Sequence, residues 1–267
     1  MVVQKARKKQ KPLSVLKFFR KIRKELIAEK KFSNYLLYAI GEIFLVVIGI
    51  LIALAIDNAN EQSIKREKEQ IYLMGLKDEF LTSKLKLEEL IRVNQVSYEA
   101  AIEIVHLMDD QDNTYEKELS RLFIDAFASD IFFNPNNSLL FEMINSGSLK
   151  DISNDTLRIR LTNWVATIDD IANQEKFLAE QRTNIVDWFR TEGYSIRTIL
   201  EDTGMASQLG IQKQKETNSN LSALQSVAFE NNILLFIVTS QSTTEHYSQL
   251  MGQLDEIIGL LKSEIEK

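Results

Sequence analysis

The residue with the most chemical potential in this sequence is Glu42, because its carboxyl group stands in a long apolar stretch. Residues 35–56 read YLLYAIGEIFLVVIGILIALAI, and Glu42 is the only charged residue among them. At about 1.5 Å per residue, a helix of this length crosses a hydrocarbon core of roughly 30 Å. Residues 43–56 alone are too short to do so. We therefore expect Glu42 at membrane depth, in a neutral, hydrogen-bonding form.

Three small residues accompany Glu42 along the predicted transmembrane helix. Gly41, Gly49 and Ala53 fall near the same helix side as Glu42, and Gly49 and Ala53 form a small-xxx-small pair. Small residues allow two helices to approach closely, and intramembrane ionisable residues seldom face lipid. The sequence therefore favours a helix–helix contact in the membrane through these four residues. Alternatively, Glu42 reaches toward the cytoplasmic headgroups and the glycines have no partner.

Few other residue types in the chain are suited to chemistry. There is no Cys, and His106 and His246 are the only histidines, which excludes thiol chemistry and most transition-metal sites. The sequence contains no nucleophile elbow, no H-E-x-x-H, no P-loop and no dinucleotide fingerprint. We therefore expect no catalytic residues, no cofactor and no metal. An enzyme would need a site of helix-borne carboxylates that spacing cannot reveal.

Charge is distributed unevenly about the predicted span. Residues 1–34 hold twelve Lys and Arg against two acids, whereas residues 57–267 hold twenty against thirty-five. The basic side of a span remains in the cytoplasm. The chain is thus predicted to be a single-pass inner-membrane protein with a periplasmic C-terminal domain. The alternative, a cleavable signal peptide, fits less well because the apolar run exceeds a typical h-region.

The basic segment 1–34 has the pattern of an amphipathic helix at the membrane surface. Apolar residues recur at three- and four-residue steps from Leu13 to Leu26, with cations between them. Such a helix lies along the inner leaflet, with its cations near anionic headgroups. We expect the lipid bilayer, and not nucleic acid, to be its partner. The predicted membrane-surface residues are Lys17, Arg20, Lys21, Arg23 and Lys24.

The exported domain, residues 57–267, reads as all α. Its sequence has few Gly and Pro and no sustained strand-like alternation. The pattern predicts a first helix over 58–108 with a weak point at Gly75. Shorter helices are predicted over 115–127 and over 139–145, the latter ended by Gly147. We expect an exposed loop over 212–220 and an elongated helical bundle with coiled-coil-like seams.

The clearest periodicity lies between Asp155 and Phe189. Its a/d-type seam comprises Leu157, Leu161, Trp164, Ile168, Ile171, Leu178, Ile185 and Phe189. Glu175 and Arg182 occupy two further seam positions, where polar residues fix register or partner choice. The first long helix is the predicted antiparallel neighbour of this seam. A C-terminal helix repeats the spacing at Leu250, Leu254, Ile257, Leu261 and Ile265.

Part of the chain resembles a known family. Residues 18–59, FFRKIRKELIAEKKFSNYLLYAIGEIFLVVIGILIALAIDNA, resemble an uncharacterised family of single-pass envelope proteins common in Bacteroidota, chiefly in YAIGEI and GILIAL. The segment FEMINSGSLK, residues 141–150, is similar to the exported region of that family. Residues 57–60 read DNAN where the family shows a run of the Asn-Asn-Trp-Asn kind. The resemblance implies compartment and topology and supplies no activity.

These features favour a non-enzymatic, membrane-anchored helical scaffold or accessory subunit of a cell-envelope assembly. It would self-associate, or bind another envelope protein, through the span and the exported bundle. One alternative is a membrane-tethered sensor, which an apolar cavity with polar groups inside the bundle would favour. Another is an ion-coupled subunit that uses Glu42, because the topology resembles the smaller subunits of proton-driven stators.

Overall fold

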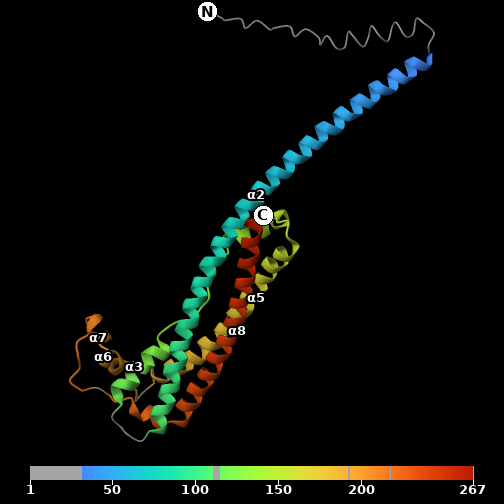
Figure 1. Cartoon of the computed structure of the whole chain (residues 1–267). Coiled ribbons are helices and arrows are strands. Elements are labelled where there is room, and N and C mark those ends of the chain that lie inside the picture. Colours follow the sequence, from blue (N-terminus) through green and yellow to red (C-terminus); the bar gives the residue numbers. More distant parts are fainter. Residues whose placement is uncertain (1–31, 111–114, 192, 217, 267) are drawn as a thin grey trace, which may run out of the picture. The chain divides into compact units, whose positions relative to one another are not determined.

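Helices account for every regular element in the described part of the chain (Figure 1). The computed structural model describes residues 32–110, 115–191, 193–216 and 218–266. The predicted all-α fold is confirmed. In chain order the elements are α2 (Phe32–Asp109), α3 (Glu116–Phe127), α4 (Ser138–Ser146), the 3-10 helix η1 (Ser148–Asp151), α5 (Asp155–Trp188), α6 (Ile196–Asp202), α7 (Met205–Gln208), the 3-10 helix η2 (Leu221–Gln225) and α8 (Val227–Ile265).

The chain divides into two compact units, Met1–Arg66 and Glu67–Lys267. In the first unit, the described residues are the beginning of α2. Its apolar side chains are exposed, and none of its most apolar window is buried within the protein. Among the described residues, α2 is the one helix long and apolar enough to cross a membrane, as predicted for 35–56.

Three long helices form the second unit: α2 from Glu67 onward, α5 and α8 (Figure 1). Hydrogen bonds and ion pairs fix the direction of α8 relative to α2. Lys84 pairs with Asp255, and further along α2 the side chain of Asn94 donates to the backbone oxygen of Ser240. Residue numbers rise along α2 as they fall along α8, so these two helices are antiparallel.

The predicted antiparallel pairing of α5 with the first helix is wrong in direction. Lys68 pairs with Asp151 just before α5 begins, and the rings of Phe80 and Trp164 lie 5.2 Å apart. Residue numbers therefore rise together, and α5 is parallel to α2. The antiparallel neighbour of α5 is α8, as the pair Arg160–Glu256 shows. Sequence periodicity marks which face of a helix is buried, but not which helix covers it.

A non-helical connection explains why α5 runs parallel to α2. After α3, residues 128–137 return along α2, and α4 and η1 bring the chain to the level of Lys68 before α5 starts. Along this connection, Ile131 and Phe133 are buried while Phe132 is half exposed, the alternation of an extended chain. The 128–137 segment is therefore a strap that lies against both α2 and α5.

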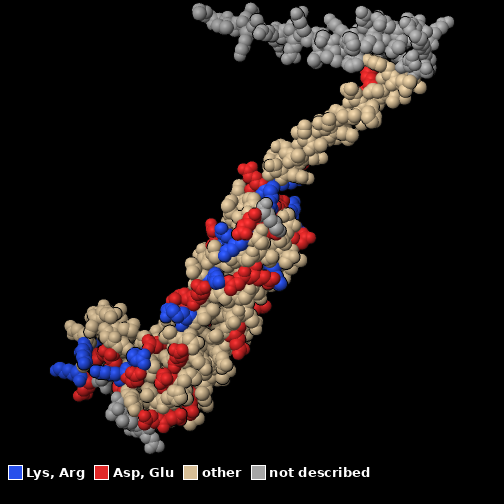
Figure 2. Space-filling model, in the orientation of Figure 1, with Lys and Arg blue, Asp and Glu red and all other residues tan. Residues whose placement is uncertain are grey.

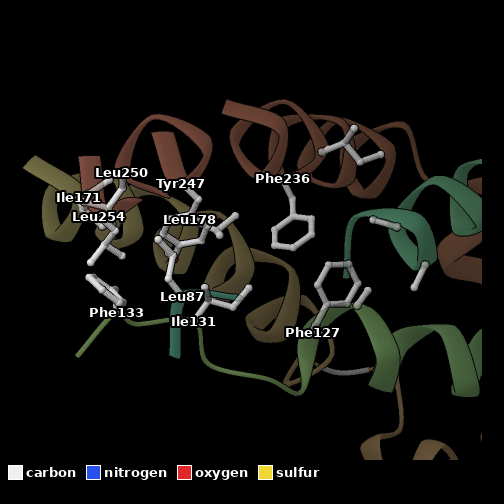
Figure 3. Packing of buried hydrophobic residues seen from close by; sticks show 14 of the residues in the cluster. Leu87, Phe127, Ile131, Phe133, Ile171, Leu178, Phe236, Tyr247, Leu250 and Leu254 are labelled. Carbon is white, nitrogen blue, oxygen red and sulfur yellow. The ribbon is translucent and has the colours of Figure 1, made fainter. Parts of the chain in front are cut away.

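The core lies between the long helices and also includes the strap. Figure 3 shows Ile131 and Phe133 pointing into the same core as Leu178, Tyr247 and Leu254. The predicted seam residues of 157–189 are buried, apart from the partly buried Ile168 and Arg182. In α8, Leu250, Leu254, Ile257 and Leu261 are also buried. Each fully buried side chain of this kind contributes roughly 1.5–3 kcal/mol.

The predictions made for Gly75 and Gly147 had different outcomes. The predicted weak point at Gly75 is wrong, because α2 continues through it. A Cβ at Gly75 would lie 2.5 Å from Cδ2 of Leu139, so this glycine permits close packing of the first turn of α4. By contrast, Gly147 ends α4 as predicted, with a left-handed φ of 72°.

Candidate functional site

The predicted contact face in the membrane lies on the first unit's part of α2. Gly41, Gly49 and Ala53 are exposed, and Glu42 is half exposed. No atom comes within 4 Å of the place where a Cβ would stand on Gly41 or on Gly49, among the contacts that the structure describes. The small residues therefore leave room for a second helix. Lys17, Arg20, Lys21, Arg23 and Lys24, the predicted membrane-surface residues, lie outside the described residues.

The two polar seam residues of α5 both bind the strap. Glu175 is 2% exposed, and its Oε1 atom accepts a hydrogen bond from the backbone N–H of Phe133 at 2.8 Å. One heptad later, Arg182 donates to the backbone oxygen of Ser129 at 3.0 Å and pairs with the Asp130 carboxylate. Polar groups of an extended segment buried against helices must find partners outside a sheet. Glu175 and Arg182 supply two of them.

A tyrosine from α8 completes the site at Glu175. The Tyr247 hydroxyl donates to Oε1 of Glu175 at 2.5 Å, so one carboxyl oxygen joins α8, α5 and the strap. Burial raises the pKa of Glu175 above the ordinary value of a glutamate, although both hydrogen bonds oppose this rise. Burial, together with the adjacent carboxylate, also raises the pKa of Tyr247.

Side chains of α2 and α5 hold the rest of the strap. Lys86 donates to the backbone oxygen of Asn134 at 2.8 Å, and the Ser83 hydroxyl accepts from the backbone N–H of Asn136 at 2.9 Å. The indole N–H of Trp164 donates to the side-chain oxygen of Asn137 at 3.0 Å. Periodicity identified Trp164 as a seam residue but gave no signal for its polar partner, which lies 27 residues earlier.

A buried polar cluster between α2 and α8 also escaped the sequence pattern. Asn94 is fully buried, and its amide donates to the backbone oxygen of Ser240 at 3.0 Å and to the Thr244 hydroxyl at 2.9 Å. The Ser240 hydroxyl donates in return to the Asn94 side-chain oxygen at 2.9 Å. In the sequence, this cluster was indicated only by Asn94, a single Asn among the apolar positions of a helix. Such a residue can fix the register of neighbouring helices.

The outer side of α5 and α8 carries an open groove of about 460 Å³. Its lining includes Thr167, Gln174, Phe177, His246, Gln249 and Gln253. The ring nitrogen Nδ1 of His246 lies 2.8 Å from the backbone oxygen of Ser242, one helical turn earlier. The other histidine, His106, is exposed near the end of α2. In the described part of the chain, no group of three or more His, Asp or Glu side chains is arranged to hold a metal.

The protein is a helical bundle whose first helix, α2, also contains a candidate membrane span. The chain belongs to the family of unknown function DUF6090, whose model matches residues 42–186. The resemblance of the chain to an uncharacterised family is thereby confirmed. The matched range begins at Glu42 and includes the strap, Glu175 and Arg182, whereas α8 with Tyr247 lies beyond it. No curated protein and no solved structure matches the chain.

Proposed function

We propose that this protein is a non-enzymatic, membrane-anchored helical scaffold or accessory subunit of a cell-envelope assembly. The observation that carries the proposal is the composition of α2. One helix contains both the apolar stretch that can cross a membrane and residues of the bundle core, from Leu73 to Ile104. The anchor and the bundle therefore share a continuous backbone. The proposed topology is a cytoplasmic N-terminus, one inner-membrane span and a periplasmic bundle.

Self-association is the first form of this proposal. In the span, Gly49 and Ala53 offer a surface with little side-chain bulk, and Glu42 lies near the same helix side. Without a hydrophobic driving force between helices in lipid, close packing and interhelical hydrogen bonds hold such contacts together. A bilayer also confines all copies to one plane, which raises their encounter frequency. Binding of a different envelope protein through the same surfaces is the second form.

Native mass spectrometry with protein identification, on the complex extracted gently from its own membranes, tests the proposal. A homo-oligomer, or a defined complex with another envelope protein, is the expected result. A monomer at native abundance would contradict both forms. A stoichiometric polytopic companion that contacts the acidic span would instead favour the ion-coupled subunit, because such a subunit needs a partner that completes its proton pathway.

Variants at Glu42 test the span contact separately. The amide of Glu42→Gln retains hydrogen-bonding capacity and should preserve assembly, whereas Glu42→Leu removes this capacity and should weaken it. An interhelical hydrogen bond in a membrane contributes about 0.6–2 kcal/mol, which corresponds to a several-fold loss of dimer. The yield of crosslinked dimer in membranes provides the measurement. Equal yields from the wild type and both variants would remove Glu42 from the contact.

The hollow that the described residues enclose inside the bundle is too small to support the ligand-sensor alternative. Between α3, the strap, α5 and α8, the described residues enclose a hollow of about 10 Å³, lined in part by Ile131 and Phe236. That volume holds about one water molecule and no small-molecule ligand. The larger groove on α5 and α8 is open to solvent and partly polar. It fits a surface contact better than ligand capture inside the core.

A further inference from the structure

One surface of the second unit differs in composition from the rest of the molecule. We define the α5/α8 face by Phe177, Gln181 and Asn184 of α5 and by Leu235, Val238 and Ser242 of α8. None of these residues is charged, although residues 57–267 carry a net charge of −15. Glu180 of α5 and Glu245 of α8 are the charged residues that border it, and Asp170 lines the groove next to it. Figure 2 shows charged side chains along the α2 side of the bundle and a largely uncharged surface over the N-terminal half of α8.

Helical spacing and the open groove place these residues on one face. Phe177 lines the groove together with Gln249 of α8. Leu235 and Ser242 precede Gln249 by fourteen and seven residues, so they lie on the same side of α8. Because α5 and α8 are antiparallel, Asn184 lies at the level of Leu235. The face therefore continues the groove toward the N-terminal end of α8.

The apolar members of the face are exposed to an unusual degree. Phe177 is 60% exposed, Leu235 is 55% exposed and Val238 is 66% exposed. The run Ile233–Val238 has no polar residue, so α8 is apolar on both its inner and its outer side here. A helix that is apolar all round is normally buried all round. The core covers Ile233, Phe236 and Ile237, whereas the outer side has no cover within the described chain.

We infer that the α5/α8 face binds the same face of a second copy of this chain, an inference that rests on the proposed self-association. Two identical domains of net charge −15 repel each other, and an uncharged face is where they approach at the lowest electrostatic cost. The Gln and Asn side chains suit a symmetric contact. Each amide is both donor and acceptor, so it can pair with the same group across a two-fold axis.

The face and the groove together have the size of a specific dimer interface. They extend from Asn231 to Gln253 of α8, a length of about 33 Å that includes Asp170 in the groove lining, and two adjacent helices are about 20 Å wide. A contact over this area buries about 1,300 Å² on the two partners together. Specific protein–protein interfaces bury roughly 1,200–2,000 Å². The polar groove would lie at one end of the interface and the apolar residues of α8 at the other.

The absence of Cys from the chain makes a single-cysteine experiment direct. Full-length Val238→Cys and Asn184→Cys are treated in native membranes with a short bis-maleimide, and dimer is measured on denaturing gels. Leu85→Cys is the matched control, because Leu85 on α2 is 67% exposed and apolar but lies outside the face. We expect dimer from the two face positions and little from Leu85→Cys.

A second pair of variants tests whether the face contributes to association. Val238→Glu places one carboxylate of each copy in the proposed interface, and about tenfold or more loss of dimer is expected. Leu85→Glu should leave the dimer unchanged. Both positions are exposed, so circular dichroism melts should confirm that both variants fold. Equal dimer from Val238→Glu and the wild type would overturn the inference.

The outcomes separate this inference from the proposed function. A homo-oligomer in native mass spectra, without crosslinking of Val238→Cys or Asn184→Cys, would show that the chain self-associates through another surface. That result would contradict the inference about the α5/α8 face and leave the proposed self-association in place. A monomer in both measurements would contradict both. A crosslinked product whose mass is not twice that of the chain would show that the face binds a different protein. That result would contradict the inference that a second copy of this chain binds there.

Discussion

At the residue scale, Glu175 is the group whose environment departs furthest from that of an ordinary surface carboxylate. It is buried, and no cation pairs with it among the contacts described. Oε1 accepts both hydrogen bonds, from Tyr247 and from the backbone of Phe133. One carboxyl oxygen therefore holds together two helices and the strap. Helical periodicity predicted its position on the buried side of α5, but it did not predict its two hydrogen-bond partners.

Glu175 should make the stability of the fold depend on pH. Burial raises its pKa in the folded state, so the folded protein binds this proton more tightly than the unfolded chain does. The resulting stabilisation is fully present below the ordinary glutamate pKa and is lost as the pH rises through the raised value. Glu175→Gln keeps the acceptor oxygen and cannot ionise. The variant should exceed the wild type in stability at neutral pH, by a margin that shrinks on acidification.

Urea unfolding of both proteins across this pH range measures the effect. Glu180→Gln is the matched control, because it makes the same substitution at an exposed position of the same helix and so measures the effect of the substitution itself. A constant stability difference between Glu175→Gln and the wild type at all pH values would show that proton binding at Glu175 is the same in the folded and unfolded states.

At the element scale, buried polar contacts decide how the helices are aligned. Apolar seams tolerate a shift along the helix axis better than hydrogen bonds do, because hydrophobic contact is non-directional. The cluster of Asn94, Ser240 and Thr244 fixes α8 against α2. The contacts of Glu175 and Arg182 fix the strap against α5. The helices are thus placed by a few directional bonds within a large apolar core.

The register role of Asn94 predicts a measurable coupling with Ser240. Asn94→Ala removes one donor from the Ser240 carbonyl and one from the Thr244 hydroxyl, which still bond to each other, and it leaves the Ser240 hydroxyl without its acceptor, at an expected cost of about 1–3 kcal/mol. Ser240→Ala removes one donor to the Asn94 side-chain oxygen and should cost about 1 kcal/mol. Because the two residues interact directly, the double variant should lose less than the sum of the single losses.

Chemical denaturation of the four proteins in this cycle supplies the coupling energy. Gln95→Ala is the control, since Gln95 is the exposed neighbour of Asn94 and should change stability by no more than about 0.5 kcal/mol. Strict additivity of the Asn94→Ala and Ser240→Ala effects would show that the two side chains act independently and that the register has another cause.

At the scale of the whole molecule, the core belongs entirely to the second unit. In the described chain, buried hydrophobic residues begin at Leu73 and continue to Leu261. A fragment of residues 67–267, without the apolar stretch, should therefore fold alone. We expect a helical circular dichroism spectrum and a single cooperative thermal transition.

A fragment that starts at residue 82 is the matched control. It loses Leu73, Leu76 and Phe80, all fully buried, each of which contributes roughly 1.5–3 kcal/mol. Their combined contribution is comparable with the total stability of a typical domain, about 5–15 kcal/mol. This shorter fragment should not fold cooperatively. Failure of the longer fragment to fold would show that the bundle requires its anchor.

The sequence by itself determined the class of secondary structure, the candidate span, and the buried face of α5 and of the C-terminal half of α8. These properties follow from local composition and from periodicity, which act over a few turns. It therefore located the buried residues of α5 and the end of α4 at Gly147, and it marked Glu175 and Arg182 as unusual. The same reasoning misjudged Gly75, because the role of that glycine depends on Leu139, far along the chain.

Only the tertiary structure decided that α5 is parallel to α2, that the strap lies between them, and that Glu175, Tyr247 and the Phe133 backbone meet. It also decided which side of α8 stays exposed, and so located the α5/α8 face. These features depend on contacts between residues tens to more than a hundred positions apart. No local pattern encodes such contacts, because many helix arrangements bury the same apolar seams equally well, and only directional bonds and shape select one of them.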